Sequence, residues 1–460
     1  MTKQVDVAVV GCGVSGSVVG AYLAKAGRKP VVFEATDRIG GPKYGGYDVN
    51  GFHADLTHIP VTALCWNGGG GWWPKAAREV GAPIQFQCLP NNAFYVGGKV
   101  ARVPYSTSGR AFANFMKNMV PFDVPEETLL GLQKVFDFAV SLPEETLWSE
   151  EYDVTPAKQI VDKITDDDLA KMLFGGLAGM MLCIPPDMAL EKVCARMVFA
   201  SFLAGLFGGQ ANMVGLIGGA CDVIPKGFCK VMTDNGGQVL LSHPVKQVRI
   251  EAGRATGVIV SLPDGSEETY QANEVIISTE YGAYKKLLGK HLPKQIETTI
   301  EAFEANAFID LDVHFGLKRP VIKPGYSFIA FIDDENTFQG LAASLPHFEP
   351  TQIPEGKELL QLQLFKPADL YKTKTPEEWT EILLSAVEKL WPGVRDEIEF
   401  KHVTEIYQPF QYSNVPVKKV PYSVPEISHL HFTGDCTVAP ASVTDKAAAS
   451  AMAVAKLLLS

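Results

Sequence analysis

A short apolar segment followed by three regularly spaced glycines opens the chain. Residues 5–10 are almost entirely apolar, which is typical of a strand in a parallel sheet that is covered on both faces. Gly11, Gly13 and Gly16 follow in the spacing G-x-G-x-x-G. This spacing allows a tight turn, close approach of a pyrophosphate and close packing of the next helix. The segment therefore predicts a βαβ unit whose helix N-terminus is directed at phosphate groups.

An acidic residue stands where the second strand of this unit should end. Glu34 directly follows the apolar run Val31-Val32-Phe33 and comes about 20 residues after the glycines. A carboxylate there accepts hydrogen bonds from the two hydroxyls of a ribose and repels a 2′-phosphate. The sequence therefore predicts a site for NAD or FAD and disfavours NADP.

Further motifs decide between these two dinucleotides. Asp37-Arg38-Ile39-Gly40-Gly41 follows Glu34, and Gly51-Phe52-His53-Ala54-Asp55-Leu56-Thr57 comes shortly after it. Near the other end, His431-Phe432-Thr433-Gly434-Asp435 precedes an alanine-rich segment that runs to Leu459. In this order the motifs resemble those of the superfamily of flavin-containing amine oxidases, protoporphyrinogen oxidases and phytoene desaturases.

The resemblance implies FAD as the cofactor, bound non-covalently because no cysteine occupies the position that carries covalent flavin in some amine oxidases. It also implies that a returning strand holds the adenine through the backbone of Val245. At the start of the last helix, backbone N–H groups would stabilise negative charge on the reduced flavin. The residues assigned to FAD are Gly11, Gly13, Val14, Ser15, Gly16, Glu34, Ala35, Arg38, Gly40, Gly41, Pro42, Lys43, Thr57, His58, Val245, Thr279, Gly434, Asp435, Val443 and Thr444.

Three residues are candidates for catalysis beside the flavin. Pro42 stands where the family commonly has Arg, and Lys43 follows it as an alternative positive charge. Thr57 replaces a family glycine, and the neighbouring His58 is either a proton donor and acceptor or a structural histidine. Tyr407, followed by Phe410 and Tyr412, precedes the Gly-Asp motif at the distance where amine oxidases build an aromatic cage.

The order of these segments predicts an α/β fold with a discontinuous cofactor domain. We expect a Rossmann-type FAD-binding domain from residues 1–60, 213–282 and 403–460. An α+β substrate-binding domain with a mixed sheet and helices would comprise residues 61–212 and 283–402. Residues 274–279 read as the buried parallel strand that returns to the cofactor.

Composition excludes some classes of function and leaves others open. A net charge of −11 opposes binding to nucleic acid. The eight cysteines include no C-x-x-C pair, so no metal site is predicted. The first strand begins close to Met1, which leaves no room for a leader and favours the cytoplasm. Peripheral contact with a membrane and a homodimer both stay open.

The segment from 169 to 220 is the most apolar of the chain, with Met172, Met180, Met181, Met188 and Met197 along it. It reads either as a helical core or as the lining of a tunnel for a hydrophobic substrate. We therefore expect an oxidoreductase of the desaturase, dehydrogenase or isomerase type, which exchanges hydride between FAD and a hydrophobic small molecule. The alternatives are a flavin amine or amino-acid oxidase and a nucleotide-binding protein without catalysis.

Overall fold

The computed structural model describes most of the chain. The described residues are 2–55, 61–64, 71–89, 93–96, 99–102, 108–120, 122–182, 184–185, 188–204, 213–217, 220–262, 264–321, 328–332, 338–344, 353–408, 419–439, 441 and 443–460. Thr57 and His58 lie outside them, as do Phe410 and Tyr412.

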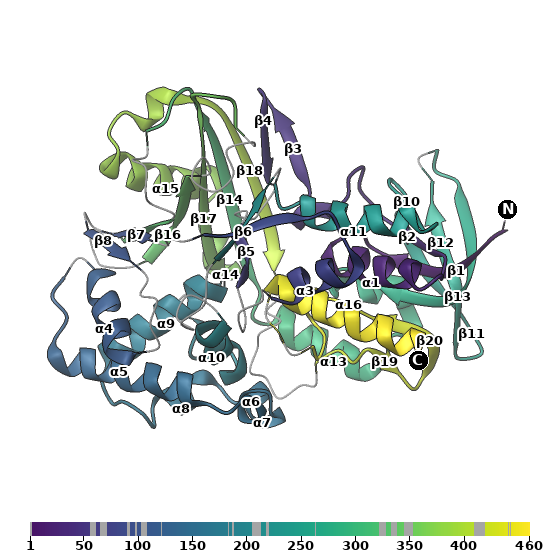
Figure 1. Cartoon of the computed structure of the whole chain (residues 1–460), viewed down its shortest axis with the longest axis horizontal. Helices are drawn as coiled ribbons and strands as arrows, with labels where there is room; N and C mark the ends of the chain where they lie inside the picture. Colours follow the sequence, from purple (N-terminus) through teal and green to yellow (C-terminus); the bar gives the residue numbers. More distant parts are fainter. Residues whose placement is uncertain are drawn as a thin grey trace.

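Strand β1 (Thr2–Val10) lies inside a mixed sheet built from distant segments (Figure 1). It pairs in parallel with β2 (Pro30–Phe33) on one side and with β13 (Glu267–Ile277) on the other. Beyond them lie β10 (Gln238–Leu240) and β20 (Ile427–Phe432), also parallel to their neighbours. Both ends and the middle of the chain thus meet in one sheet, which confirms the predicted α/β fold.

An antiparallel extension widens this sheet. β11 (Val245–Glu251) pairs with β12 (Arg254–Ser261), which pairs with the first half of β13. The short β19 (Ser423–Val424) pairs with β20 at the edge.

Helices cover both faces of the sheet. On one face α1 (Val14–Lys25) packs between α11 (Val223–Asp234) and α16 (Val443–Leu459), and α3 (Trp72–Val80) lies against α16 (Figure 1). On the other face are α12 (Gly282–Leu288), the 3₁₀ turn η2 (Gly289–His291) and α13 (Lys294–Glu304). Successive residues of a strand point to opposite faces, so Val7 and Val9 join one core while Ala8 and Val10 join the other.

A second sheet stands beside the first. Its described strands are, in spatial order, β18 (Ile398–Gln408), β14 (Phe308–Leu317), β17 (Glu358–Pro367), β16 (Phe338–Ser344), β15 (Phe328–Ile332), β7 (Ala93–Val96) and β8 (Lys99–Arg102). On one face α15 (Pro376–Leu390) packs against Leu311, Val313 and Phe315 of β14. This helix begins with a capping box in which Thr375 and Glu378 satisfy each other's backbone N–H groups.

A helical layer completes this half of the molecule (Figure 1). Its described members are α4 (Gly109–Asn118), α5 (Glu126–Ser141), α6 (Glu144–Leu147), α7 (Glu150–Val154), α8 (Ala157–Val161), α9 (Asp168–Leu182) and α10 (Ala195–Ala204). Met188 and Met197 are buried in its core, while Met172 is 56% exposed. Where the structure describes it, the apolar segment from 169 onward therefore packs chiefly as a helical core.

Turns precede α10 at residues 188–192, and the helix begins at Ala195. Just before it, Cys194 makes a bridge to Pro156, and the Ala195 amide donates to the carbonyl of Thr155. No helix among the described residues combines the length and apolar character needed to cross a bilayer.

Smaller elements connect these layers. They are α2 (Gly41–Tyr44), the pair β3 (Gly46–Val49) and β4 (Phe52–Asp55), the sheet of β5 (Val61–Leu64), β9 (Met213–Ile217) and β6 (Gln85–Leu89), the turn helix α14 (Ala368–Tyr371) and the 3₁₀ turn η5 (Val394–Glu397). β9, which we expected in the cofactor domain, pairs with β5 and β6 rather than with the sheet around β1.

Candidate active site

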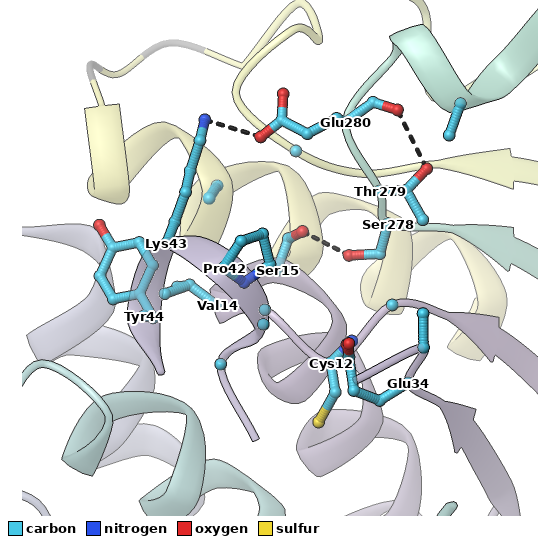
Figure 2. Close-up of a pocket in the computed structure, with 18 of the residues that line it drawn as sticks. Cys12, Val14, Ser15, Glu34, Pro42, Lys43, Tyr44, Ser278, Thr279 and Glu280 are labelled. Carbon is cyan, nitrogen blue, oxygen red and sulfur yellow. Dashed lines mark hydrogen bonds and ion pairs between the residues drawn. The ribbon is translucent and has the colours of Figure 1, made fainter. Parts of the chain in front are cut away.

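A cavity of about 500 Å³ begins at the carboxyl ends of β1 and β2 and extends toward β14. Glu34 lies at one side of it and Lys43 and Glu280 at the other (Figure 2). Its walls come from segments far apart in the sequence: Val10–Ser15, Phe33–Thr36, Gly40–Tyr44, Leu182, Pro244, Val245, Ser278–Glu280, Ala283, Lys286, Leu287, Phe308, Asp310, Gln408, Gly434, Asp435, Thr444 and Ala447.

The glycine turn is shaped by its contact with the end of β13. Gly11 adopts a φ of +102°, and a Cβ there would stand 2.6 Å from the carbonyl oxygen of Ser278. Ser15, in the first turn of α1, makes a hydrogen bond between its hydroxyl and that of Ser278 (Figure 2). The first helical turn and the strand end are thus locked together, with the N-terminus of α1 facing the cavity.

Glu34 is held in place by backbone donors. Its Oε2 accepts from the Cys12 amide at 2.8 Å, and its Oε1 accepts from the Thr36 amide at 2.9 Å. The side chain is 5% exposed and lines the cavity. Oε1 also accepts from the Thr36 hydroxyl at 2.9 Å, whereas Oε2 keeps a second lone pair that can accept from a ribose hydroxyl.

The opposite end of the cavity, which we call the distal end, is formed by Lys43, Leu182, Phe308, Asp310 and Gln408. Phe308 and Gln408 are partners in the β14–β18 register, and Asp310 lies two residues further along the same face of β14. Leu182 and Phe308 belong to one apolar cluster. The distal end therefore combines apolar walls with two charged side chains.

Lys43 is the cation at this end. Its Nζ lies 2.7 Å from Oε1 of Glu280, and its side chain is 17% exposed (Figure 2). Burial lowers the pKa of the Lys43 ammonium, but the carboxylates of Glu280, Asp435 and Asp310 together raise it above its usual range. Lys43 therefore stays charged at neutral pH.

The N-terminal turn of α16 closes another wall. Thr444 lines the cavity and shares a hydrogen bond with the hydroxyl of Tyr44. Asp445 accepts from the backbone amide of Trp73 at 3.0 Å, which ties α16 to the start of α3. Before this helix, the Gly434 amide donates to the Ser450 hydroxyl at 2.8 Å. The Gly-Asp motif is thus held against α16, which itself packs on α1.

The structure brings most of the described candidates to the cavity. The residues that line it are Gly11, Gly13, Val14, Ser15, Glu34, Ala35, Gly40, Gly41, Pro42, Lys43, Val245, Thr279, Gly434, Asp435 and Thr444. Gly16 is buried beneath the loop, and Arg38 bonds to Asp37 and to the carbonyl of Gly46 instead. Val443 begins α16, next to the lining residue Thr444.

Tyr407 is not brought to the cavity. Its neighbour Gln408 lines it, and adjacent residues of a strand point to opposite faces. Tyr407 is accordingly 52% exposed. Thr57 and His58 lie outside the described residues.

The sequence reading missed several residues of the site. Ser278, Glu280, Asp310 and Gln408 line the cavity without belonging to any motif that we used. Ser278 and Glu280 flank the predicted contact Thr279. Their position at the end of the same strand could have indicated that they also line the site. For Asp310, the polar alternation in Asp310-Leu311-Asp312-Val313-His314 indicates a strand with one polar face but not that this face is buried.

Comparison with known proteins identifies the scaffold. The profile of the family described as flavin containing amine oxidoreductase matches residues 14–459. The chain belongs to this family. It is an FAD-dependent oxidoreductase, as the motifs at Gly11 and Gly434 predicted.

Its relatives are distant in sequence. Prolycopene isomerase of Daucus carota is 23% identical over 450 residues, covering 87% of this chain and 69% of that protein. The 15-cis-phytoene desaturase of Capsicum annuum is 22% identical over 427 residues, covering 86% of this chain and 66% of that protein. This chain thus spans about two thirds of the length of either relative.

Solved structures show the same fold. An oxidoreductase from Methanosarcina mazei has a TM-score of 0.73 at 17% identity, with 99% of this chain and 100% of that chain covered. The similarity extends over both the cofactor part and the second sheet.

The residues of the cavity fit FAD. A Cβ at Gly13 would meet nothing within 4 Å, so the absence of a side chain leaves room for a pyrophosphate above the N-terminus of α1. Glu34 offers acceptors to the ribose, and Val245 lies where the adenine is expected. Gly434, Asp435 and Thr444 line the way toward the distal end.

Proposed function

We propose that this flavoprotein exchanges hydride between FAD and a C–H bond of a small molecule with an apolar body, as a desaturase, dehydrogenase or isomerase would. The observation that carries the proposal is the composition of the distal end, where Leu182 and Phe308 offer apolar walls next to Lys43 and Asp310. The relatives named for carotenoid chemistry support the same substrate class.

In this reaction the protein would bind FAD and substrate, orient them and adjust the electrostatic environment of the flavin. Bound FAD supplies the two-electron acceptor or donor. Lys43 places a positive charge at the distal end, which favours negative charge on a reduced cofactor. The N-terminal turn of α16, beginning at Val443, directs backbone N–H groups and the positive end of the helix dipole to the same region.

Non-covalent binding of the cofactor is part of the proposal. Among the described residues that line the cavity, the cysteine is Cys12, and its Sγ lies 3.4 Å from Sγ of Cys229. The hydrogen bond to Cys229 and burial both raise the pKa of the Cys12 thiol, which therefore stays protonated and a poor nucleophile.

Amine oxidation is the second candidate. The buried carboxyl group of Asp310 at the distal end favours it, because a carboxylate would hold a cationic amine. Against it, Tyr407 does not reach the cavity, so the aromatic cage that we considered is not formed by this residue.

Anaerobic mixing of the holoenzyme with candidate substrates tests the proposal. We expect phytoene in detergent micelles to bleach the flavin absorbance and a panel of primary amines to leave it unchanged. Bleaching by amines alone would replace the proposal with the second candidate. A flavin that dithionite reduces but neither class reduces would instead favour a nucleotide-binding protein without catalysis.

A further inference from the structure

Three polar residues of β14 share one buried face. Asp310, Asp312 and His314 alternate with Leu311 and Val313, which pack against α15 on the opposite face. The three polar side chains are 3%, 0% and 0% exposed. Two carboxyl groups buried on one side of one strand cost much free energy unless protons or donors compensate them.

The two carboxyl groups are compensated unequally. Oδ1 of Asp312 accepts from Nε2 of Gln361 at 2.7 Å, and Gln363 also hydrogen-bonds to this side chain. Oδ1 of Asp310 and Oδ2 of Asp312 have no N–H or hydroxyl donor among the described residues. The two carboxyl groups lie two residues apart on the same buried face of β14, and a proton held between them would satisfy these two oxygens.

Asp310 connects this pair to the reaction site. It lines the distal end of the cavity, whereas Asp312 lies behind it against β17. The charged groups that face Asp310 among the described residues are Asp312 on its own strand and Lys43 on α2. Gln361 and Gln363, which face the pair from β17, do not titrate. A proton shared by the two carboxyl groups is therefore held by a side chain, Asp310, that lines the cavity.

We propose that Asp310 is the acid–base group of the reaction at this site and that Asp312 is the positioning residue that shares its proton. The inference rests on the proposed function. In the oxidative direction, bound FAD would supply the acceptor for the hydride of one substrate C–H bond. The carboxylate of Asp310 takes the proton from the adjacent substrate atom, and the electron pair of that second bond forms the new double bond. The substrate thus loses two electrons and two hydrogens, one as the hydride and the other as the proton that Asp310 holds.

The titration of the pair supports this role. Burial raises the pKa of Asp310 to about 7, although the hydrogen bond to Asp312 and the charge of Lys43 both lower it. Burial and the neighbouring Asp310 raise the pKa of Asp312 well above its usual range. A group that titrates near neutral pH serves equally well as acid and as base.

Infrared titration of the oxidised holoenzyme tests the pair without any substrate. Asp445 is another carboxyl group with a raised pKa, and it is half-buried, so all variants are made in an Asp445→Asn background. We expect a protonated-carboxyl C=O band that is lost as pH rises through about 7 in this parent. After Asp310→Asn this titrating band should be absent, while the band of the buried Asp312, whose pKa is raised well above its usual range, persists to higher pH. A band titrating near pH 7 that the Asp310→Asn change leaves intact would overturn the shared proton, while the proposed function would stand.

Kinetics of flavin reduction test the acid–base role. With a substrate that bleaches the parent flavin, Asp310→Asn should slow reduction about 100-fold or more. Asp312→Asn should keep most of the rate but move the pH profile to lower pH, because its amide donates to Asp310 without sharing a proton. A merely structural pair predicts no movement of this profile. An unchanged rate in Asp310→Asn, or an unmoved profile in Asp312→Asn, would overturn the role.

Discussion

The Nζ atom of Lys43 lies 2.7 Å from Oε1 of Glu280, so an ion pair joins α2 to the segment that follows β13 at the distal end of the cavity. The pair links the turn after the second strand of the βαβ unit to the returning strand. A cation is thereby fixed where the flavin ring is expected.

Removal of this cation should change the reduction potential of the bound flavin. Lys43→Met should lower the midpoint potential by about 30 mV, which corresponds to about 1.4 kcal/mol for a two-electron couple. The physical reason is that a nearby positive charge stabilises the reduced form. Glu280→Gln, which keeps the cation and removes its partner, should raise the potential. Reductive titration against a reference dye measures both, and equal potentials in all three proteins would contradict the role of Lys43.

The glycine at position 13 should be needed for cofactor binding but not for folding. Gly13 has a φ of −74°, which alanine adopts without strain, and its Cβ would point into open space. Gly13→Ala should therefore leave the stability of the apoprotein within about 0.5 kcal/mol and weaken FAD binding about 100-fold. Fluorescence titration with FAD measures the affinity. Gly176→Ala on α9, where a Cβ also meets nothing, is the matched control and should bind FAD normally.

His53 should make stability depend on pH in the alkaline range. Its Nε2 lies 3.2 Å from the buried carboxylate of Asp222, and its Nδ1 lies 2.7 Å from Asp48. The hydrogen bond to Asp222, helped by Asp48 and opposed by burial, raises the pKa of His53 to about 9. Because the folded pKa lies above the unfolded value, the stabilisation is fully present below about pH 6.5 and is lost as pH rises through about 9.

Urea denaturation of wild type and His53→Gln measures this stabilisation. The variant should be less stable by about 2 kcal/mol at pH 6, and the difference should shrink toward zero above pH 10. A difference that is the same at both pH values would show that the ion pairs of His53 contribute nothing.

Asp445 should also make stability fall as pH rises, but at lower pH and because its ionised form is disfavoured in the native state. Burial raises the pKa of this carboxyl group to about 7, although backbone hydrogen bonds from Trp73 and Trp72 lower it. The native state therefore holds a proton that the unfolded state releases near pH 4, and stability falls as pH rises from about 4 to 7. Asn cannot ionise and still accepts from the Trp73 amide, so the stability of Asp445→Asn relative to wild type should rise by about 3 kcal/mol from pH 5 to pH 8. Urea midpoints at these two pH values test the sign.

The cofactor part of the fold was predictable because the residues that form its strands and turns are also the residues expected to bind the dinucleotide. The apolar segment before Gly11 and the acid at Glu34 mark two strands that are covered on both faces. A short, continuous apolar run of this kind fits few structures other than a buried parallel strand. The Gly434-Asp435 motif was predictable as well, and both of its residues line the cavity.

The distal end was not predictable in the same way. Alternation along β14 indicates one apolar and one polar face, and a polar face ordinarily meets water. Here Asp310, Asp312 and His314 are buried instead, because residues far away in sequence, such as Gln361 and Lys43, close over them. Local periodicity does not show which face of a strand is covered by another layer. The sequence therefore predicts Tyr407 as a site residue, whereas its neighbour Gln408 lines the cavity.

The flavin content of the purified or reconstituted chain tests the central claim most directly. Distant segments around Gly13, Glu34, Val245 and Gly434 would wrap one FAD, so we expect one FAD per chain, released intact by acid or heat, and its loss in Gly13→Ala. A chain that takes up no FAD, or that binds it equally well after Gly13→Ala, would contradict the account.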